Sequence, residues 1–363
     1  MKWFGFLPAL AAILLGCNGV QRSESDYTMT AYEPVYASGF EIKAPQDSTD
    51  GSRLLVTRSA WQGDGAPQTE LVVDGRPAMR LVAMSSSHVA MLDALGVADC
   101  IVGVSGKQFL STPAVVDRLD QVADVGYDGN IDYEKLVAVD PDIVLLYGVN
   151  GASSMEGKLN ELGIPFVYVG DYMEETPLGK AEWLRFLAEI VGRQQRADSL
   201  LSEIALRYTE LERLASAAAG RPSVMLNMPV GDQWFLPTPG GYMPRLIADA
   251  GGRYLFATDD SRTSVPVDFE AAFEMLSRAD IWLNPGMATD LESIAQLAPK
   301  LSQVPAVAAG SVYNNNARTT PAGGNDFWES SAVHPDVVLA DLIAIIHPEL
   351  LPDRELYYFR HLR

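Results

Sequence analysis

The feature that most constrains the fold is an alternation of short apolar strands and capped helices that begins near residue 80. The expected strands lie at 81–84, 101–104, 143–147 and 165–169, and the expected helices at 88–95, 133–139 and 155–162. Asp132 is a suitable N-cap, and Gly96 and Gly163 are suitable helix ends. Strands that are apolar along their whole length are typical of a parallel sheet with helices on both faces. The sequence therefore predicts an α/β fold.

The same order of elements recurs in the second half of the chain. Residues 131–134 and 267–270 both place an apolar residue, Asp, an aromatic residue and Glu at the start of a helix. An Asp-Ile strand then follows, at Asp142 in the first half and at Asp280 in the second. This repetition predicts two Rossmann-like lobes of similar structure.

Residues 177–220 differ from both halves, because apolar side chains such as Trp183 recur at helical spacing over the whole segment. A helix of this length exceeds what a crossover in a small sheet needs. We therefore expect one long helix that joins the lobes, with a kink near Gly192. The predicted domains are an N-terminal lobe at 78–176, the interlobe helix at 177–220 and a C-terminal lobe at 221–363.

The N-terminus has the pattern of a secretory signal. Lys2 provides a positive charge, residues 3–15 are nearly all apolar, and the sequence Leu-Leu-Gly-Cys that ends at Cys17 resembles a bacterial lipobox. We expect residues 1–16 to be removed as a signal peptide and Cys17 to be lipidated. Elsewhere no apolar stretch is long enough to span a bilayer. These features predict a lipid-anchored protein on the periplasmic side of the cell envelope.

The segment 17–77 lacks helical periodicity, and Gly, Asp, Pro and Ser interrupt its short apolar pieces. The apolar pieces lie at 39–42, 53–57 and 70–73. They predict two or three β-strands in hairpins that follow a flexible tether. The chain is thus expected to carry an N-terminal β extension in front of its two lobes.

Composition and the missing motifs exclude several classes of function. With 47 Asp and Glu against 27 Lys and Arg, the formal net charge is −20, which disfavours nucleic-acid binding. No HExxH, GxSxG, P-loop or GxGxxG motif is present, so we expect no enzyme. A bare transition-metal site needs about four converging ligands, and the chain has only 4 His. A metal-ion carrier and an enzyme built on the same fold remain as alternatives.

Two lobes whose strands end at a shared cleft bind ligands at the carboxyl ends of those strands. Aromatic faces suit a macrocycle or a catecholate, and an arginine suits an anionic group. Gly and Pro residues predict loops at the cleft, among them residues 231–237, and the candidates in the C-terminal lobe lie in these loops. They are Trp234, Phe235, Tyr242, Arg262, Asn325, Phe327 and Trp328. Those in the N-terminal lobe are Ser86, Ser87, His88, Lys107, Tyr127 and Tyr147. His88 is interpreted either as an iron ligand or as a helix-start histidine packed against backbone.

The ordered series of motifs resembles a known family. The motifs are RLVAMSSSH at 80–88, LDALG at 92–96, DYEKL at 132–136, PDIVL at 141–145 and GKAEW at 179–183. Together they resemble the periplasmic-binding proteins for ferric siderophores, haem and cobalamin, over about residues 78–350.

The resemblance implies a monomeric solute-binding lipoprotein of an ABC importer, with little hinge motion and no cofactor. It would capture a ferric siderophore, haem or another metal complex such as the corrinoid cobalamin in the interlobe cleft, and deliver it to the inner-membrane permease and its ATPase. In this family, acidic side chains at the tip of each lobe pair with arginines of the permease. Glu156 and Glu292 occupy corresponding positions in the two halves and are the candidates for that contact.

Overall fold

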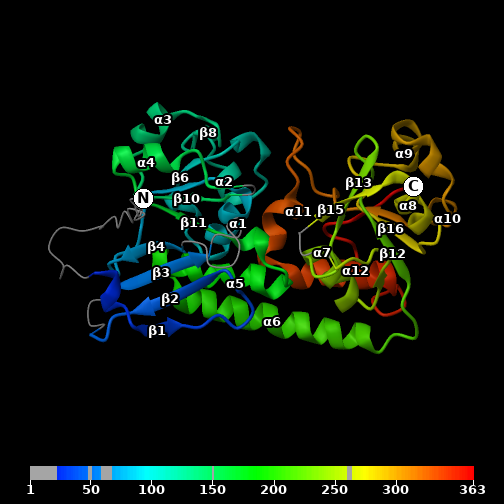
Figure 1. The fold of residues 1–363 in the computed structure, drawn as a ribbon, viewed down its shortest axis with the longest axis horizontal. Coiled ribbons are helices and arrows are strands. Elements are labelled where there is room, and N and C mark those ends of the chain that lie inside the picture. Colours follow the sequence, from blue (N-terminus) through cyan, green and yellow to red (C-terminus); the bar gives the residue numbers. More distant parts are fainter. Residues whose placement is uncertain (1–22, 48–50, 59–67, 149–150, 260–263) are drawn as a thin grey trace, which may run out of the picture.

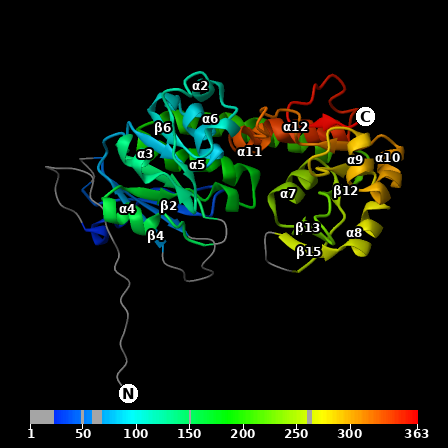
Figure 2. The ribbon, with the colours of Figure 1, turned by 90° about the horizontal axis from the view of Figure 1, so that it is seen from above.

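A computed structural model of the chain describes residues 23–47, 51–58, 68–148, 151–259 and 264–363. Two α/β lobes lie side by side in it, and a long helix runs along one side of both (Figure 1). The view from above, in Figure 2, shows the same separation into two lobes. The predicted fold class is confirmed.

A four-stranded antiparallel sheet precedes the lobes, with strand order β1–β2–β3–β4. Its strands are β1 (Met29–Tyr32), β2 (Phe40–Ala44), β3 (Arg53–Arg58) and β4 (Gln68–Val73). β2 alternates with period two, so that Phe40 and Ile42 are buried while Glu41 is not. Of the two or three strands expected, the three apolar pieces correspond to β2, β3 and β4. β1 is an additional strand, which its sequence Met-Thr-Ala-Tyr does not predict.

The N-terminal lobe contains a five-stranded parallel sheet with strand order β11–β10–β5–β6–β7. Its strands are β5 (Leu81–Ala83), β6 (Ile101–Val104), β7 (Ala123–Asp124), β10 (Ile143–Leu146) and β11 (Phe166–Tyr168). Its helices are α1 (Ser86–Ala94), α2 (Pro113–Val116), α3 (Tyr133–Ala138) and α4 (Glu156–Leu162). β8 (Gly126–Tyr127) and β9 (Asn130–Ile131) form a small hairpin. Every residue of β5 and β10 is buried, as the apolar strands predicted.

The C-terminal lobe contains a second five-stranded sheet, with strand order β14–β12–β16–β17–β18, in which only β18 is antiparallel. Its strands are β12 (Ser223–Leu226), β14 (Arg253–Tyr254), β16 (Ile281–Leu283), β17 (Val312–Asn314) and β18 (Arg360–His361). Its helices are α7 (Tyr242–Asp249), α8 (Phe269–Leu276), α9 (Leu291–Leu297), α10 (Pro305–Ala308), α11 (Asp326–Glu329) and α12 (Pro335–Ile346). A separate antiparallel pair joins β13 (Gln233–Pro237) to β15 (Ser264–Asp268).

Short 3-10 helices connect these elements. They are η1 (Glu24–Asp26), η3 (Ala98–Cys100), η4 (Lys107–Phe109), η5 (Asp171–Met173), η6 (Pro299–Gln303) and η7 (Ser330–Val333). Cys100, which the sequence predicts to be a small core residue, is buried.

The predicted duplication is visible in matching interactions. Asp132 and Asp268 each cap a helix by accepting a hydrogen bond from the third backbone amide of that helix. The Asp142 carboxylate accepts from the Arg80 backbone amide at 3.0 Å, and the Asp280 carboxylate accepts from that of Ser223 at 2.7 Å. Both aspartates therefore fix the start of the first strand of their lobe. In each sheet that first strand is an inner strand: β5 lies between β6 and β10, and β12 lies between β14 and β16.

The segment between the lobes is two helices rather than the single one expected. α5 (Pro177–Val191) is almost wholly buried and belongs to the N-terminal lobe. It ends at Gly192, whose φ of +65° suits glycine, and α6 (Gln194–Ser216) follows. α6 runs along both lobes (Figure 1): its Ile204 packs in the N-terminal core and its Tyr208 in the C-terminal core.

Candidate functional site

The lobes also touch through a segment of the C-terminal lobe that contains α11 and η7. The carboxylate of Glu329, which is buried, accepts hydrogen bonds from the backbone amides of Ser111 at 2.8 Å and Thr112 at 2.7 Å. A Cβ atom on Gly324 would lie 1.9 Å from the Phe109 carbonyl oxygen, so only glycine fits at this contact. Val333 of η7 packs within the N-terminal core. This segment therefore locks one lobe against the other.

Beside this contact, polar side chains from both lobes gather in one buried cluster. Asp171 of η5 lies 3.7 Å from the Nε2 of His88 and 3.6 Å from the Nζ of Lys180. The hydroxyl of Ser87 donates to Asp171 at 3.3 Å. The Nζ of Lys180 lies 5.3 Å from the ring centre of Tyr242, which begins α7 of the other lobe. We call these five residues the junction cluster.

The junction cluster holds one pair of opposite charges and one neutral imidazole. Burial lowers the pKa of His88 below its ordinary value, so the ring is neutral at pH 7, although Asp171 opposes this shift. Neither His88 nitrogen has a hydrogen-bond partner among the described residues. Because the His88 side chain is fully buried, it is not displayed to a ligand on the surface. The interpretation as a packed helix-start histidine agrees with this geometry, and the interpretation as an iron ligand stays a prediction.

Exposed aromatic rings lie along the line where the lobes meet. Phe109 is 38% exposed, Tyr127 45% and Trp328 58%. The Tyr127 hydroxyl accepts a hydrogen bond from the Gln108 side chain at 2.8 Å, and Thr320 of the other lobe donates to the Gln108 carbonyl oxygen at 3.3 Å. An open recess of about 560 Å³ lies beside Tyr127. We call Phe109, Tyr127 and Trp328 the aromatic rim.

Two predicted aromatic residues lie in the core rather than in loops. Trp234 lies in β13 with no exposed surface, and its Nε1 donates to the Leu226 carbonyl oxygen at 2.9 Å. Its neighbour Phe235 points outward, as the alternation of a strand requires. Phe327 is fully buried in the C-terminal core. The predicted loop at 231–237 is therefore wrong, because this segment pairs with β15.

The other predicted residues have local partners. The Asn325 side chain caps α11, and the Lys107 ammonium donates to the Leu119 carbonyl oxygen at 3.1 Å. Ser86 is the first residue of α1 and is half-buried. Tyr147 is half-buried against a hydrophobic cluster of the N-terminal lobe. Arg262 and Cys17 lie outside the described residues.

Of the predicted residues, the structure thus brings Ser87, His88 and Tyr242 into the junction cluster, and places Tyr127 and Trp328 on the aromatic rim. Asp171 and Lys180 of the cluster were not predicted, although Lys180 belongs to the GKAEW motif. Asp171 follows the last strand of its sheet, which is a place where functional side chains gather, and this signal could have identified it.

The two candidate docking residues lie far apart on the same side of the molecule. Glu156 begins α4 and Glu292 lies in the first turn of α9. Both helices are at the edge remote from α6 (Figure 1). Glu292 is exposed, whereas Glu156 is half-buried and accepts a hydrogen bond from the Tyr168 hydroxyl at 2.5 Å.

Within the described ranges, no three His, Cys, Asp or Glu side chains gather in a way that could hold a metal ion. No helix among the described residues has the length and apolar character needed to cross a membrane.

Comparison with known proteins identifies the class. The periplasmic binding protein family matches residues 81–319, so the chain belongs to that family. It is a substrate-binding protein of the ABC-transporter type and not an enzyme. The family match begins at β5 and leaves the N-terminal sheet outside.

Two curated relatives have low but extended similarity. An uncharacterized lipoprotein of Methanocaldococcus jannaschii is 25% identical over 372 aligned residues, which cover 95% of this chain and 87% of the relative. An uncharacterized ABC transporter substrate-binding lipoprotein of Bacillus subtilis, YvrC, is 23% identical over 42% of this chain and 46% of its own length. Relatives of this chain are thus lipoproteins.

Solved structures share the fold. A periplasmic binding protein from Veillonella parvula has a TM-score of 0.63 at 16% identity, over 81% of this chain and 98% of that one. A periplasmic heme-binding protein from Pseudomonas aeruginosa has a TM-score of 0.59 at 19% identity, over 75% of this chain and 93% of that one.

Proposed function

We propose that this substrate-binding protein captures a metal-organic complex, namely a ferric siderophore, haem or cobalamin, between its lobes and delivers it to the permease of an ABC importer. The observation that carries the proposal is the aromatic rim, which places exposed rings of both lobes at their meeting line. Such rings offer flat apolar faces to a large planar or chelated ligand. The haem-binding structure with the same fold is consistent with a ligand of this kind.

Lys180 adds a cation near the lobe boundary. Its side chain is 15% exposed, while its charge partner Asp171 is 1% exposed. Lys180 is therefore more accessible to solvent than its charge partner, and its ammonium can meet an anionic group such as a propionate or a catecholate. Arg262 stays a prediction for the same role.

A titration tests the proposal. The mature chain with Cys17→Ser would be titrated with haemin, cyanocobalamin and a ferric catecholate siderophore while tryptophan fluorescence is followed. We expect one of these ligands to saturate the protein, and Trp328→Ala to weaken that binding. Tyr36→Ala removes an aromatic ring that is 41% exposed in the segment before β2, away from the rim, and is the matched control. If all three ligands fail to bind, the proposed ligand class is wrong.

We further propose that Cys17 carries the lipid and that Glu156 and Glu292 contact the permease. A carboxylate at the outer edge of each lobe gives two anchoring points, and charge pairs at a rim govern association and register more than they govern ligand affinity. α4 and α9 lie on the same side of the molecule, remote from α6 (Figure 1), which supports the proposal that this side faces the permease.

A further inference from the structure

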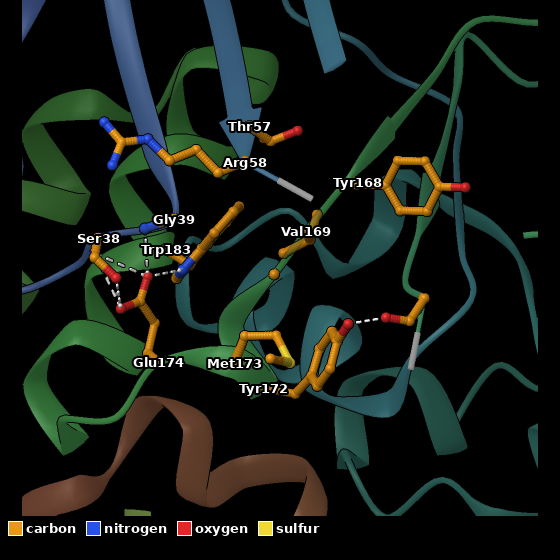
Figure 3. Close-up of a pocket in the computed structure, with 12 residues that line it drawn as sticks. Ser38, Gly39, Thr57, Arg58, Tyr168, Val169, Tyr172, Met173, Glu174 and Trp183 are labelled. Carbon is orange, nitrogen blue, oxygen red and sulfur yellow. Dashed lines mark hydrogen bonds between the residues drawn. The ribbon is translucent and has the colours of Figure 1, made fainter. Parts of the chain in front are cut away.

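A cavity of about 240 Å³ lies between the N-terminal sheet and the N-terminal lobe (Figure 3). Ser38 and Gly39, which precede β2, and Thr57 and Arg58, which end β3, form one wall. The other wall consists of Gly148, which follows β10, residues 168–170 and 172–174 at the carboxyl end of β11, and Trp183 of α5. The first wall lies outside the residues that match the family, so family membership alone does not account for this cavity.

Buried hydrogen bonds hold the two walls in a fixed relation. The Glu174 carboxylate accepts from the backbone amide of Gly39 at 2.9 Å and from the indole Nε1 of Trp183 at 3.0 Å. Nearby, the Glu182 carboxylate accepts from the backbone amides of Tyr36 and Ala37, each at 2.6 Å. Both carboxylates are buried, where hydrogen bonds to a charged group are strong. These hydrogen bonds fix the N-terminal sheet to the lobe, so the cavity between the sheet and the lobe is preformed.

Two glycines bring the backbone against the Trp183 ring. A Cβ atom on Gly39 would lie 2.8 Å from Cζ2 of that ring, and a Cβ atom on Gly170 would lie 3.1 Å from it. Larger residues would crowd the indole and reduce the space. The ring is thus held in one position, at the floor of the cavity.

The remaining surface is apolar and aromatic, and its polar groups already have partners. Val169, Met173 and the ring of Tyr172 face the space in Figure 3. The Tyr172 hydroxyl donates to the Gly148 carbonyl oxygen. The Arg58 guanidinium bonds Glu41 at 2.8 Å and points away from Val169 and Tyr172 in Figure 3. Among the described residues that line the cavity, the charged groups are therefore the Glu174 carboxylate and the Arg58 guanidinium, which is paired with Glu41.

We propose that this cavity is a second binding site, which takes an uncharged, planar aromatic group of one ring. A preformed apolar space of this size accommodates a small aromatic molecule, and the Trp183 and Tyr172 rings favour aromatic over saturated rings. An anionic ring binds less well, because its carboxylate would lose water and approach the buried Glu174 carboxylate, while Arg58, the cation among the described lining residues, is already paired with Glu41. The site is separate from the ligand proposed for the interlobe cleft.

Calorimetric titration of the mature chain tests this with three probes of similar size. Benzyl alcohol is uncharged and planar, benzoate is anionic, and cyclohexylmethanol is uncharged but not planar. We expect saturable binding of benzyl alcohol, at least tenfold weaker binding of benzoate and weaker binding of cyclohexylmethanol. No saturable binding of benzyl alcohol, or equal binding of benzoate, would overturn the proposal.

Two variants locate the site. Met173→Trp should fill the space and raise the dissociation constant of benzyl alcohol at least tenfold. Gly170→Ala, which adds a single carbon against Trp183, should raise it several-fold and covers the case in which Met173→Trp does not fold. The matched control is Gly157→Ala, where a Cβ atom meets nothing within 4 Å. If neither folded variant weakens binding, the site is not this cavity.

The two proposals can fail separately. Trp328→Ala should leave benzyl alcohol binding unchanged, and Gly170→Ala should leave the binding of the metal complex unchanged. Loss of benzyl alcohol binding in Trp328→Ala would show that the probe occupies the interlobe site, and the second site would then be refuted.

Discussion

Removal of the Glu329 carboxylate should strongly destabilise the contact between the lobes. This buried group accepts from the backbone amides of Ser111 and Thr112 and also from the Ser111 hydroxyl at 2.9 Å. In Glu329→Ala, the buried amide of Thr112 and the partly buried amide of Ser111 would lose their acceptor, and each unsatisfied group costs about 1–3 kcal/mol. The expected loss in the free energy of unfolding is therefore about 2–6 kcal/mol.

Urea denaturation followed by circular dichroism measures this loss. Glu355→Ala is the matched control, since Glu355 is an exposed glutamate of the same lobe, and surface substitutions change stability by about 0.5 kcal/mol or less. Glu329→Gln keeps one acceptor oxygen and should fall between the wild type and Glu329→Ala. A loss below about 1 kcal/mol in Glu329→Ala would refute the reasoning, because the amides must then have found other acceptors.

The remaining predictions concern the ligand, the transporter and pH. Trp328→Ala should weaken binding of the preferred metal complex by about 1–3 kcal/mol without loss of stability. Trp234→Ala should instead lower the free energy of unfolding by about 3–5 kcal/mol. Equal effects of the two substitutions on ligand affinity would contradict the assignment of Trp234 to the core. Glu156→Lys combined with Glu292→Lys should leave ligand binding intact and abolish stimulation of the transporter ATPase in liposomes; undiminished stimulation would remove both from the docking surface. Because burial lowers the pKa of His88 in the folded chain, the unfolded chain takes up a proton first as the pH falls below about 6.5, and stability decreases. His88→Leu should therefore reduce the loss of stability between pH 7 and pH 5, as measured by urea denaturation at each pH, and an unchanged loss would assign it to other groups.

Features that depend on neighbouring residues could be predicted from the sequence. Asp132 and Asp268 cap their helices because an aspartate side chain reaches an amide only three positions away. The strand β10 follows from its run of apolar residues alone. The break at Gly192 follows from the conformational freedom of glycine, although the pattern on either side suggested a single helix.

Features that depend on distant pairing could not. Gly and Pro on either side of Trp234 predict a loop, but β15, about 30 residues further along the chain, pairs with this segment as a strand, and Trp234 is buried. Asp171 and Lys180 acquire their neighbours only when η5, α1 and α7 pack together. The sequence near Glu329 does not predict that its carboxylate accepts hydrogen bonds from Ser111 and Thr112.

If Cys17 carries a lipid as proposed, the firm attachment of the N-terminal sheet to its lobe limits the distance between that lobe and the membrane. Tyr27 is buried against this sheet, with Leu54 and Val56. With a lipid on Cys17, the chain from residue 17 to residue 27 could extend by roughly 35 Å at most. The N-terminal lobe would therefore stay in a thin layer above the bilayer. It would reach a permease by lateral diffusion in two dimensions. Inserting residues between Cys17 and Tyr27, without a change in either lobe, would therefore let the protein bind and release its ligand farther from the bilayer.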